Sequence, residues 1–278
     1  MLGALVIVFR EIFEAGLIVG IVLAATRLVA GSRWWIAAGV AGGIAGSLVL
    51  AAFAGVVSEW ADGFGQELFN AGILAIAAVM LIWHNLWMAH HGRELAADLA
   101  ATGKAVSDGQ RSLAALALVV GIAVLREGAE IALFMYGIIL AGGDSWSSLA
   151  LGSALGLLLG GGVSALTYFG LVKIPMRHLF SVTSVLITFL AASMASQSAA
   201  YLERAGKIDW LSATAWDTSW LLQEGSIPGR LMHTMFGYSQ QPSEFQVLVY
   251  VVTLIAVVVA TRTLSARGHH AARHASAG

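Results

Sequence analysis

The chain has 278 residues, of which 58% are hydrophobic and 11% are charged, whereas about a quarter of the residues of a soluble domain are charged. The mean hydropathy of +0.81 and the 32 glycines, which lie largely within apolar runs, are typical of membrane helices that pack through small residues. The formal net charge of −1 provides no electrostatic footprint for nucleic acid, and the lack of cysteine excludes disulfides and thiolate metal sites. We therefore expect an all-α integral membrane protein.

Apolar runs long enough to cross a bilayer, which takes about 20 helical residues, recur along the chain. The connections between them are short, with two exceptions. Residues 90–112 are expected to form a charged loop, and residues 203–244 are too many to be structureless in a compact domain. The seven predicted spans are, in chain order, Leu2–Leu28, Trp34–Val57, Leu68–Ala89, Leu113–Ala141, Leu149–Val172, Leu179–Leu202 and Phe245–Thr261.

The first and fourth spans carry the same charged motif, Arg-Glu-x-x-Glu, at Arg10–Glu14 and at Arg126–Glu130. Glycines recur at four-residue spacing in the second and fifth spans, and the third and sixth spans both begin with Leu-Phe. Spans one to three and four to six are therefore predicted to be two copies of one unit, inverted because each copy has an odd number of spans. The predicted organisation is a single transmembrane domain over residues 1–278, with repeat one at about 1–90, repeat two at about 113–202, an extracytoplasmic loop at 203–244, a seventh helix at 245–262 and a cytoplasmic tail at 263–278.

The distribution of lysine and arginine predicts the orientation of the chain. With the N-terminus outside, ten of the basic residues between the spans face the cytoplasm and three face outward. We therefore expect a multi-pass protein of the inner, cytoplasmic membrane with a cytoplasmic C-terminus. The ten are Arg27, Arg33, Arg93, Lys104, Arg111, Lys173, Arg177, Arg262, Arg267 and Arg273, and the three are Arg204, Lys207 and Arg230.

The two motifs place three ionisable side chains within five residues of a membrane helix, where each costs about 2.5–3.5 kcal/mol on insertion scales. Glutamates at i and i+3 share a helix face, and the arginine is four residues before the second glutamate, close enough to pair with it. Both motifs are near the middle of their spans, so facing helices would bring four carboxylates and two guanidiniums together, with a formal charge of −2. The predicted metal ligands are Glu11, Glu14, Glu127 and Glu130, and the predicted charge-balancing residues are Arg10 and Arg126.

Carboxylate oxygens suit hard cations, which favours Fe³⁺, Mn²⁺, Ca²⁺ or Mg²⁺ over Cu⁺ or Zn²⁺. The alternative is a purely structural role, in which each motif is a buried ion-pair network that joins helices. Two copies in equivalent positions, each with a surplus negative charge, favour a cation site instead.

Candidates for the rest of a pathway are weaker. The acids of the loops lie mostly on the predicted outer face, where we expect Asp209, Asp217 and Glu224 to attract cations through their field. His84 lies in the inner third of the third span; a lone histidine there is more often a helix–helix contact, but it is a candidate for the exit path. The hydroxyl groups of the sixth span can line a pathway or join helices equally well.

The paired Arg-Glu-x-x-Glu motifs in spans one and four resemble those of the oxidase-dependent iron permease family, which comprises bacterial EfeU-type permeases and fungal high-affinity iron permeases. The blocks Phe9–Leu17 and Gly237–Ser243 are also similar to its N-terminal and C-terminal blocks. The resemblance covers nearly the whole chain and carries over the six motif residues as functional positions. It implies uptake of ferric iron as a transported ion, with no permanently bound cofactor. It also implies an extracytoplasmic ferroxidase or iron-delivery protein as partner, besides the lipid bilayer.

Two alternatives remain at this point. An intramembrane di-metal carboxylate enzyme would use Glu-x-x-His on two helices, and neither motif here contains histidine. A carrier or exporter of another hard cation could use the same glutamates. We expect an iron uptake permease and not an enzyme.

Overall fold

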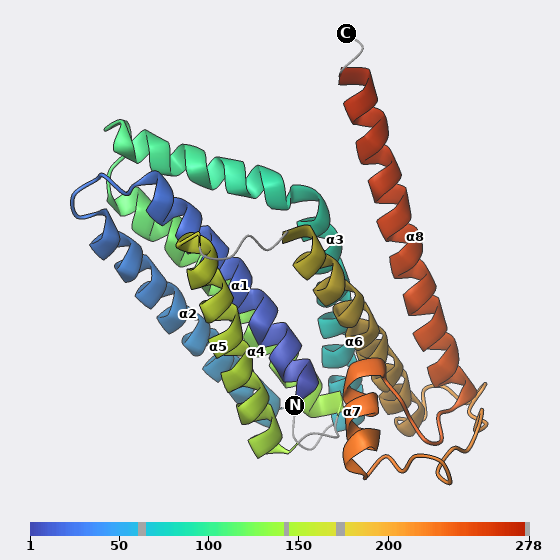
Figure 1. Cartoon of the computed structure of the whole chain (residues 1–278). Coiled ribbons are helices and arrows are strands. Elements are labelled where there is room, and N and C mark those ends of the chain that lie inside the picture. Colours follow the sequence, from blue (N-terminus) through green and yellow to red (C-terminus); the bar gives the residue numbers. More distant parts are fainter. Residues whose placement is uncertain (61–64, 142–144, 171–175, 276–278) are drawn as a thin grey trace. The chain divides into compact units, whose positions relative to one another are not determined.

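The computed structural model describes residues 1–60, 65–141, 145–170 and 176–275, and Figure 1 shows these parts as helices, with a long irregular segment on either side of α7. The described residues form eight helices and no strand, apart from one isolated bridge between Thr214 and Ser243. The all-α prediction is confirmed. The helices are α1 (Leu2–Ala25), α2 (Ser32–Trp60), α3 (Gln66–Ser107), α4 (Ala114–Ala141), α5 (Trp146–Tyr168), α6 (Met176–Arg204), α7 (Ile227–Phe236) and α8 (Glu244–Ala275).

Each predicted span falls on one of the seven long helices, with ends that differ by a few residues at most of them. Among the described residues, five helices are long and apolar enough to cross a membrane: α2, α3, α5, α6 and α8. The other two, α1 and α4, have 24 and 28 residues, but each carries the three charged residues of its motif. The chain is a multi-pass membrane protein, and a count of seven spans stays a prediction.

Helix α3 corrects one prediction, because it continues to Ser107 through most of the expected charged loop. The polar side chains of this half, such as Glu94 and Lys104, lie on an exposed face. Its opposite face buries Leu99 and Val106 in an apolar cluster with residues of α1, α2 and α4. Charge made the segment resemble a loop, whereas its apolar residues recur at the helical period.

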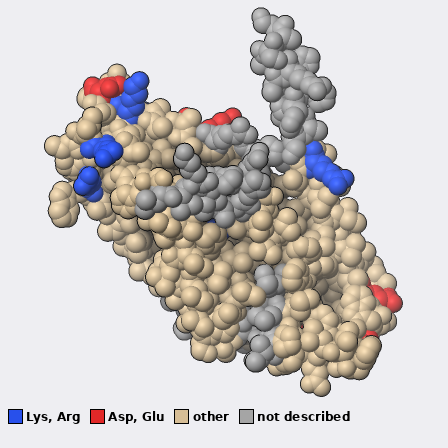
Figure 2. Space-filling model, viewed as in Figure 1, with Lys and Arg blue, Asp and Glu red and all other residues tan. Residues whose placement is uncertain are grey.

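By its contacts the described chain divides into two compact units. The first contains Met1–Phe64, Arg93–Ile139 and Asp144–Thr183, and the second contains Gly65–Gly92, Leu140–Gly143 and Ser184–Gly278. In the first unit α1, α2, α4 and α5 run side by side (Figure 1). Lys and Arg side chains gather at the end of this unit where the α1–α2 and α3–α4 connections lie (Figure 2). Exposed basic residues there are Arg27, Arg33, Lys104 and Arg111.

Glycines of α5 let α1 approach very closely. A Cβ atom built on Gly152 would lie 3.1 Å from the backbone carbon of Met1, and one built on Gly156 would lie 2.8 Å from the carbonyl oxygen of Leu5 and 2.9 Å from the nitrogen of Phe9. Ordinary contacts of a Cβ atom are 3.4–4 Å, so only glycine fits at these positions. The helix that carries the first motif therefore packs backbone to backbone against α5.

Helix α2 packs against α4 in the same register. A Cβ atom on Gly39 would meet the backbone of Ala117, and one on Gly43 would lie 2.7 Å from the carbonyl oxygen of Gly121. Met1 and Ala117, like Leu5 and Gly121, are 116 residues apart, while the contacting glycines of α2 and α5 are 113 residues apart. The two helix pairs, α5 with α1 and α2 with α4, therefore pack with the same offset; the repeat itself stays a prediction, in which the second helix of each copy would pack against the first helix of the other.

In the second unit, hydroxyl groups of α6 join helices, which favours the second of the two explanations given for them. The Ser198 hydroxyl donates to the carbonyl oxygen of Ala71 in α3 at 2.7 Å. The Ser184 hydroxyl donates to Asn85 Oδ1 at 2.6 Å, and Asn85 Nδ2 donates back to the Ser184 carbonyl at 3.3 Å. These bonds hold the N-terminal half of α3 to α6.

The long connection between α6 and α8 contains α7, so it is not structureless, as expected from its length. The Ser226 side chain caps the start of α7, and Pro228 lies in its first turn. The helix ends at Gly237, whose φ of 68° is in the left-handed region that glycine adopts without strain. A Cβ atom on Gly237 would lie 3.0 Å from the Cα atom of Ser193 in α6, so the end of α7 rests directly on α6.

Candidate metal site

The first motif forms a buried ion pair on α1. Arg10 Nε donates to Glu14 Oε1 at 2.8 Å, and the two side chains are 3% and 1% exposed. Glu11, next to Arg10, is also fully buried. The pairing at i and i+4 is the one that the spacing predicts. Close packing of α1 on α5 excludes solvent around this half of the site.

The second motif makes the same pair in a more open environment. Arg126 Nε donates to Glu130 Oε1 at 3.0 Å and lies 3.9 Å from Glu127 Oε1. The Arg126 side chain is 37% exposed, although both glutamates are buried. The two half-sites therefore have the same chemistry but are not equally buried within the chain.

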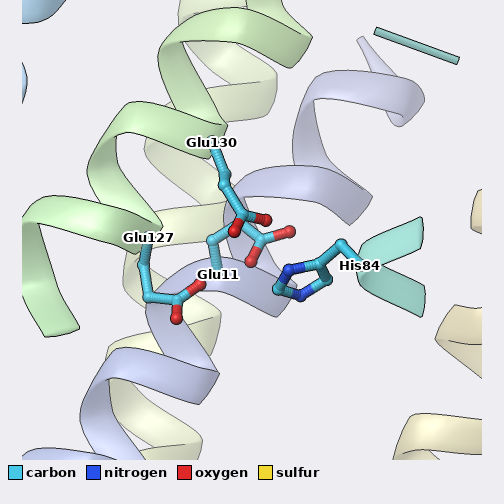
Figure 3. Close-up of side chains that lie close together, drawn as sticks. All are labelled: Glu11, His84, Glu127 and Glu130. Atoms are coloured by element: carbon cyan, nitrogen blue, oxygen red, sulfur yellow. The ribbon is translucent and has the colours of Figure 1, made fainter. Parts of the chain in front are cut away.

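Carboxylates from both motifs come together. Glu11 of α1 and Glu127 and Glu130 of α4 each offer one oxygen, and these oxygens lie within 4.8 Å of one another (Figure 3). Electrostatic attraction also acts between the two helices: Glu130 of α4 attracts Arg10 of α1, and Glu14 of α1 attracts Arg126 of α4. Within the first unit, three of the four predicted carboxylates thus lie close together, and Glu14 is not in that group.

The spacing of these oxygens suits one hard cation. Ligand oxygens on opposite sides of Mg²⁺ are about 4 Å apart, and those around Ca²⁺ up to about 5 Å. Glu14, the fourth predicted ligand, forms an ion pair with Arg10, with 2.8 Å between Glu14 Oε1 and Arg10 Nε. When all four glutamates are ionised, the two arginines leave a charge of −2 for a cation to neutralise.

His84 is 2% exposed in α3 and is labelled in Figure 3, but it belongs to the second compact unit. Its neighbour Asn85 ties α3 to Ser184 of α6, as described above. A role for His84 on the exit path stays a prediction from its place in the sequence.

The three predicted capture residues of the outer loop differ in their surroundings. Asp209 is exposed. Asp217 accepts hydrogen bonds from the Ser219 hydroxyl at 2.6 Å, the Ser219 backbone nitrogen at 2.9 Å and Gln241 Nε2 at 2.8 Å. These bonds, those of Ser219 above all, lower the pKa of Asp217. Glu224 lies 2.9 Å from His233 Nδ1, a partner that the sequence did not indicate. Two further loop aspartates on the predicted outer face, Asp62 and Asp144, lie outside the described residues.

Several long apolar helices and a cluster of carboxylates buried between two helices are features expected of a membrane transporter for cations. The chain matches the Iron permease FTR1 family over residues 1–267, and it belongs to that family. It is accordingly a transporter and not an enzyme.

The chain matches individual relatives over nearly its whole length, and these relatives share one kind of name. The chain is 31% identical over 274 residues to the ferrous iron permease EfeU of Shigella sonnei (strain Ss046) and to that of Escherichia coli O157:H7, with 97% of this chain and 98% of each relative covered. It is 32% identical over 259 residues to the ferrous iron permease EfeU of Escherichia coli O6:K15:H31, with 91% and 92% covered. No solved structure matches the chain.

Proposed function

We propose that this permease imports iron across the cytoplasmic membrane and that the ion passes through the site formed by the two Arg-Glu-x-x-Glu motifs. The observation that supports this most is the group of three buried carboxylates, Glu11, Glu127 and Glu130, within 4.8 Å of one another on two helices. Anionic groups crowded together away from water repel one another, and a bound cation relieves that repulsion. The two arginines neutralise part of the charge, so the ion is held weakly enough to leave.

The transported form is proposed to be ferric, because the donor set in the two motifs consists of carboxylates alone. The relatives are named as ferrous iron permeases, which makes Fe²⁺ the second candidate. Uptake of radioactive iron into proteoliposomes separates the two when it is measured once with ascorbate and once with ferric citrate. Faster uptake with ascorbate would assign the site to Fe²⁺.

The orientation is proposed to have the N-terminus outside and the C-terminus in the cytoplasm. The basic residues at the α1–α2 and α3–α4 end of the first unit (Figure 2) support it, since such residues mark the cytoplasmic face. Because the chain has no cysteine, single cysteines introduced at Ser107 and at Gly225 can be labelled without background. An impermeant reagent added to intact cells should modify only the one at Gly225, and the reverse pattern would overturn the orientation.

The path on either side of the site is proposed from the placement of polar residues. His84 lies toward the inner end of its span, where it would line the exit. On the outside, the exposed carboxylates of Asp209 and Asp217 would raise the local concentration of cations. We also propose an extracytoplasmic ferroxidase or iron-delivery protein as the source of the ion.

The test of the function is uptake by variants in which one motif glutamate becomes glutamine. Glutamine keeps the shape but removes a hard anionic ligand, so each variant of Glu11, Glu127 or Glu130 should lose at least about tenfold in flux, equivalent to about 1.4 kcal/mol. Glu94→Gln, on the exposed face of α3, is the matched control and should transport normally. If the three variants insert normally and still move iron at wild-type rates, the motifs are structural ion pairs and the proposal is wrong.

A further inference from the structure

Four basic side chains gather where the α1–α2 and α3–α4 connections lie, at one end of the first unit (Figure 2). All four are exposed, and none forms an ion pair within the described part of the chain. The only acid in residues 26–35 and 104–113 is Asp108, so four positive charges face one negative charge and three are in surplus. We call these four residues the basic surface: Arg27, Arg33, Lys104 and Arg111.

A contact between α3 and the end of α1 brings Arg27 near Lys104. A Cβ atom built on Gly103, which precedes Lys104, would lie 3.6 Å from Thr26 Cγ2, and Thr26 precedes Arg27. The turn after Thr26 is ordered, because the Ser32 hydroxyl donates to the Thr26 carbonyl oxygen at 3.1 Å. The backbones that carry these two basic residues are therefore held next to each other.

A second contact brings Arg33 near Arg111. A Cβ atom on Gly31 would lie 3.8 Å from Leu113 Cδ1, and each of these two residues is two positions from one of the arginines. The backbone nitrogen of Arg111 donates to the Ala105 carbonyl oxygen at 3.2 Å, so the α3–α4 connection is also an ordered turn. Positive charges held together in this way repel one another, and a bound anion relieves the repulsion.

Large apolar side chains border the basic surface. Leu28 is 96% exposed in the α1–α2 turn, and Trp34, in the first turn of α2, is 82% exposed. The part of α2 that is apolar and long enough to cross a membrane, Ser32–Phe53, begins at this turn, which puts both side chains at the boundary between headgroups and acyl chains. Tryptophan is enriched at that boundary, and long basic side chains there reach toward the headgroups. A water-soluble anion would gain nothing from the exposed leucine and tryptophan, whereas a lipid would.

We propose that the basic surface binds the headgroups of anionic phospholipids, with Leu28 and Trp34 between the adjoining acyl chains. The lipid phosphate accepts charge-assisted hydrogen bonds from the guanidinium and ammonium groups, and only an anionic lipid has a net charge that balances the surplus. Bound lipid connects the ends of α1, α3 and α4, so it stabilises the first unit. The inference concerns the bilayer and not the transported ion, so it stands or falls independently of the proposed function.

The first test identifies the lipid beside the basic surface. Because the chain has no cysteine, a fluorophore on Ala30→Cys, at an exposed position of the α1–α2 turn, reports on this place alone. The full chain is placed in nanodiscs with phosphatidylcholine as the major and phosphatidylglycerol as the minor lipid. Bromine, which quenches the fluorophore, is carried by phosphatidylglycerol in one sample and by an equal amount of phosphatidylcholine in the other.

We expect brominated phosphatidylglycerol to quench the fluorophore on Ala30→Cys at least about twofold more strongly, because the basic surface concentrates the anionic lipid. A fluorophore on Gly225→Cys, in the second unit, is the control and should show no preference. Equal quenching by the two lipids at Ala30→Cys would overturn the proposal.

The second test measures affinity through the thermal midpoint of the full chain in detergent as phosphatidylglycerol is added. Arg27→Gln and Lys104→Gln should each raise the half-saturating lipid concentration about fivefold, the effect of one charge near an anionic surface, whereas Arg27→Lys should bind nearly as the wild type. Leu28→Ser should also weaken binding, because it removes apolar contact with the acyl chains. Lys207→Gln, which removes an exposed lysine of the second unit, is the matched control and should leave the affinity unchanged. If phosphatidylcholine or inorganic phosphate raises the midpoint as much as phosphatidylglycerol, or if Arg27→Gln and Lys104→Gln bind as the wild type, the proposal is wrong.

Discussion

Alanine at Gly156 tests the contact on which the position of the first motif depends. A Cβ atom there lies 2.8 Å from the Leu5 carbonyl oxygen and 2.9 Å from the Phe9 nitrogen, both of which are backbone atoms of α1 that no side-chain rotation can move. To reach an ordinary contact of 3.4 Å, α1 must move by about 0.6 Å at this point. Phe9 directly precedes Arg10, so the displacement acts at the motif itself.

The expected effect has two parts. Overpacking of this kind costs about 1–3 kcal/mol, only partly offset by the roughly 1 kcal/mol that alanine gains over glycine in a helix. A misplacement of 1 Å at a reacting group can cost about a hundredfold, so a shift of about 0.6 Å should lower iron flux by about tenfold. We expect Gly156→Ala to lower both the thermal midpoint and the flux per folded molecule.

The same helix supplies the control. A Cβ atom on Gly161 meets nothing within 4 Å, so Gly161→Ala should be neutral or slightly stabilising. In the other pair, Gly43→Ala should reproduce the defect and Gly42→Ala should not, because only Gly43 faces a backbone. Thermal unfolding in detergent and uptake normalised to folded protein measure the two parts. If Gly156→Ala and Gly43→Ala behave like their controls, these helix pairs are not as closely packed as described and the reasoning fails.

Other predictions follow from the surroundings of the charged residues. Arg10→Lys should lower flux more than Arg126→Lys, because Arg10 is enclosed beside its carboxylate, where the lost fork geometry has no replacement, whereas Arg126 is less closely packed. Equal losses in uptake assays would contradict this. Neutralising Asp209 and Asp217 together should raise the half-saturating iron concentration at low ionic strength with maximal flux nearly unchanged, and the effect should fade with salt, since the Debye length is about 10 Å at 0.1 M. Because hydrogen bonds lower the pKa of Asp217, its contribution to loop order is present above its unfolded pKa, about 3.9, and is lost only as the pH falls through the lower folded value; hydrogen exchange should show Asp217→Asn loosening the loop at pH 7 and the wild type unchanged between pH 7 and 5.

The elements of the fold were predictable from the sequence to the extent that burial in lipid imposes a pattern on it. Each apolar run became a helix, because a membrane leaves backbone groups no other partner. The second half of α3 was not predicted, since Glu94 and Lys104 made it resemble a loop, although its apolar residues recur at the helical period and Leu99 and Val106 pack against α1, α2 and α4. The facing of the two motif-bearing helices was expected, but the pairing of the glycine-bearing helices α2 and α5 was beyond the sequence. Glycines indicate a close approach, but they do not say which helix approaches.

The candidate site was predicted in its residues but not in its environment. The spacing within each motif specified the arginine–glutamate pair at four residues, which the structure contains twice. Nothing in two identical motifs predicted that Arg10 would be buried and Arg126 half open, because solvation depends on neighbouring helices. His233 was missed for the same reason. Its three partners are a carboxylate nine residues away and two backbone carbonyls, which leave no mark in the sequence.

On the predicted repeat, the matched registers of the two helix pairs would also record how the two copies diverged. Where the registers correspond, Gly160 of α5 faces Ile12 of α1, whereas Ser47 of α2 faces Gly128 of α4. The large and small partners have changed places between the copies, so the two copies preserve a close fit and not the identity of either residue. A substitution tolerated in one copy should therefore be harmful at the equivalent position of the other, and covariation among relatives should link Ser47 with Gly128 more strongly than either with its own counterpart.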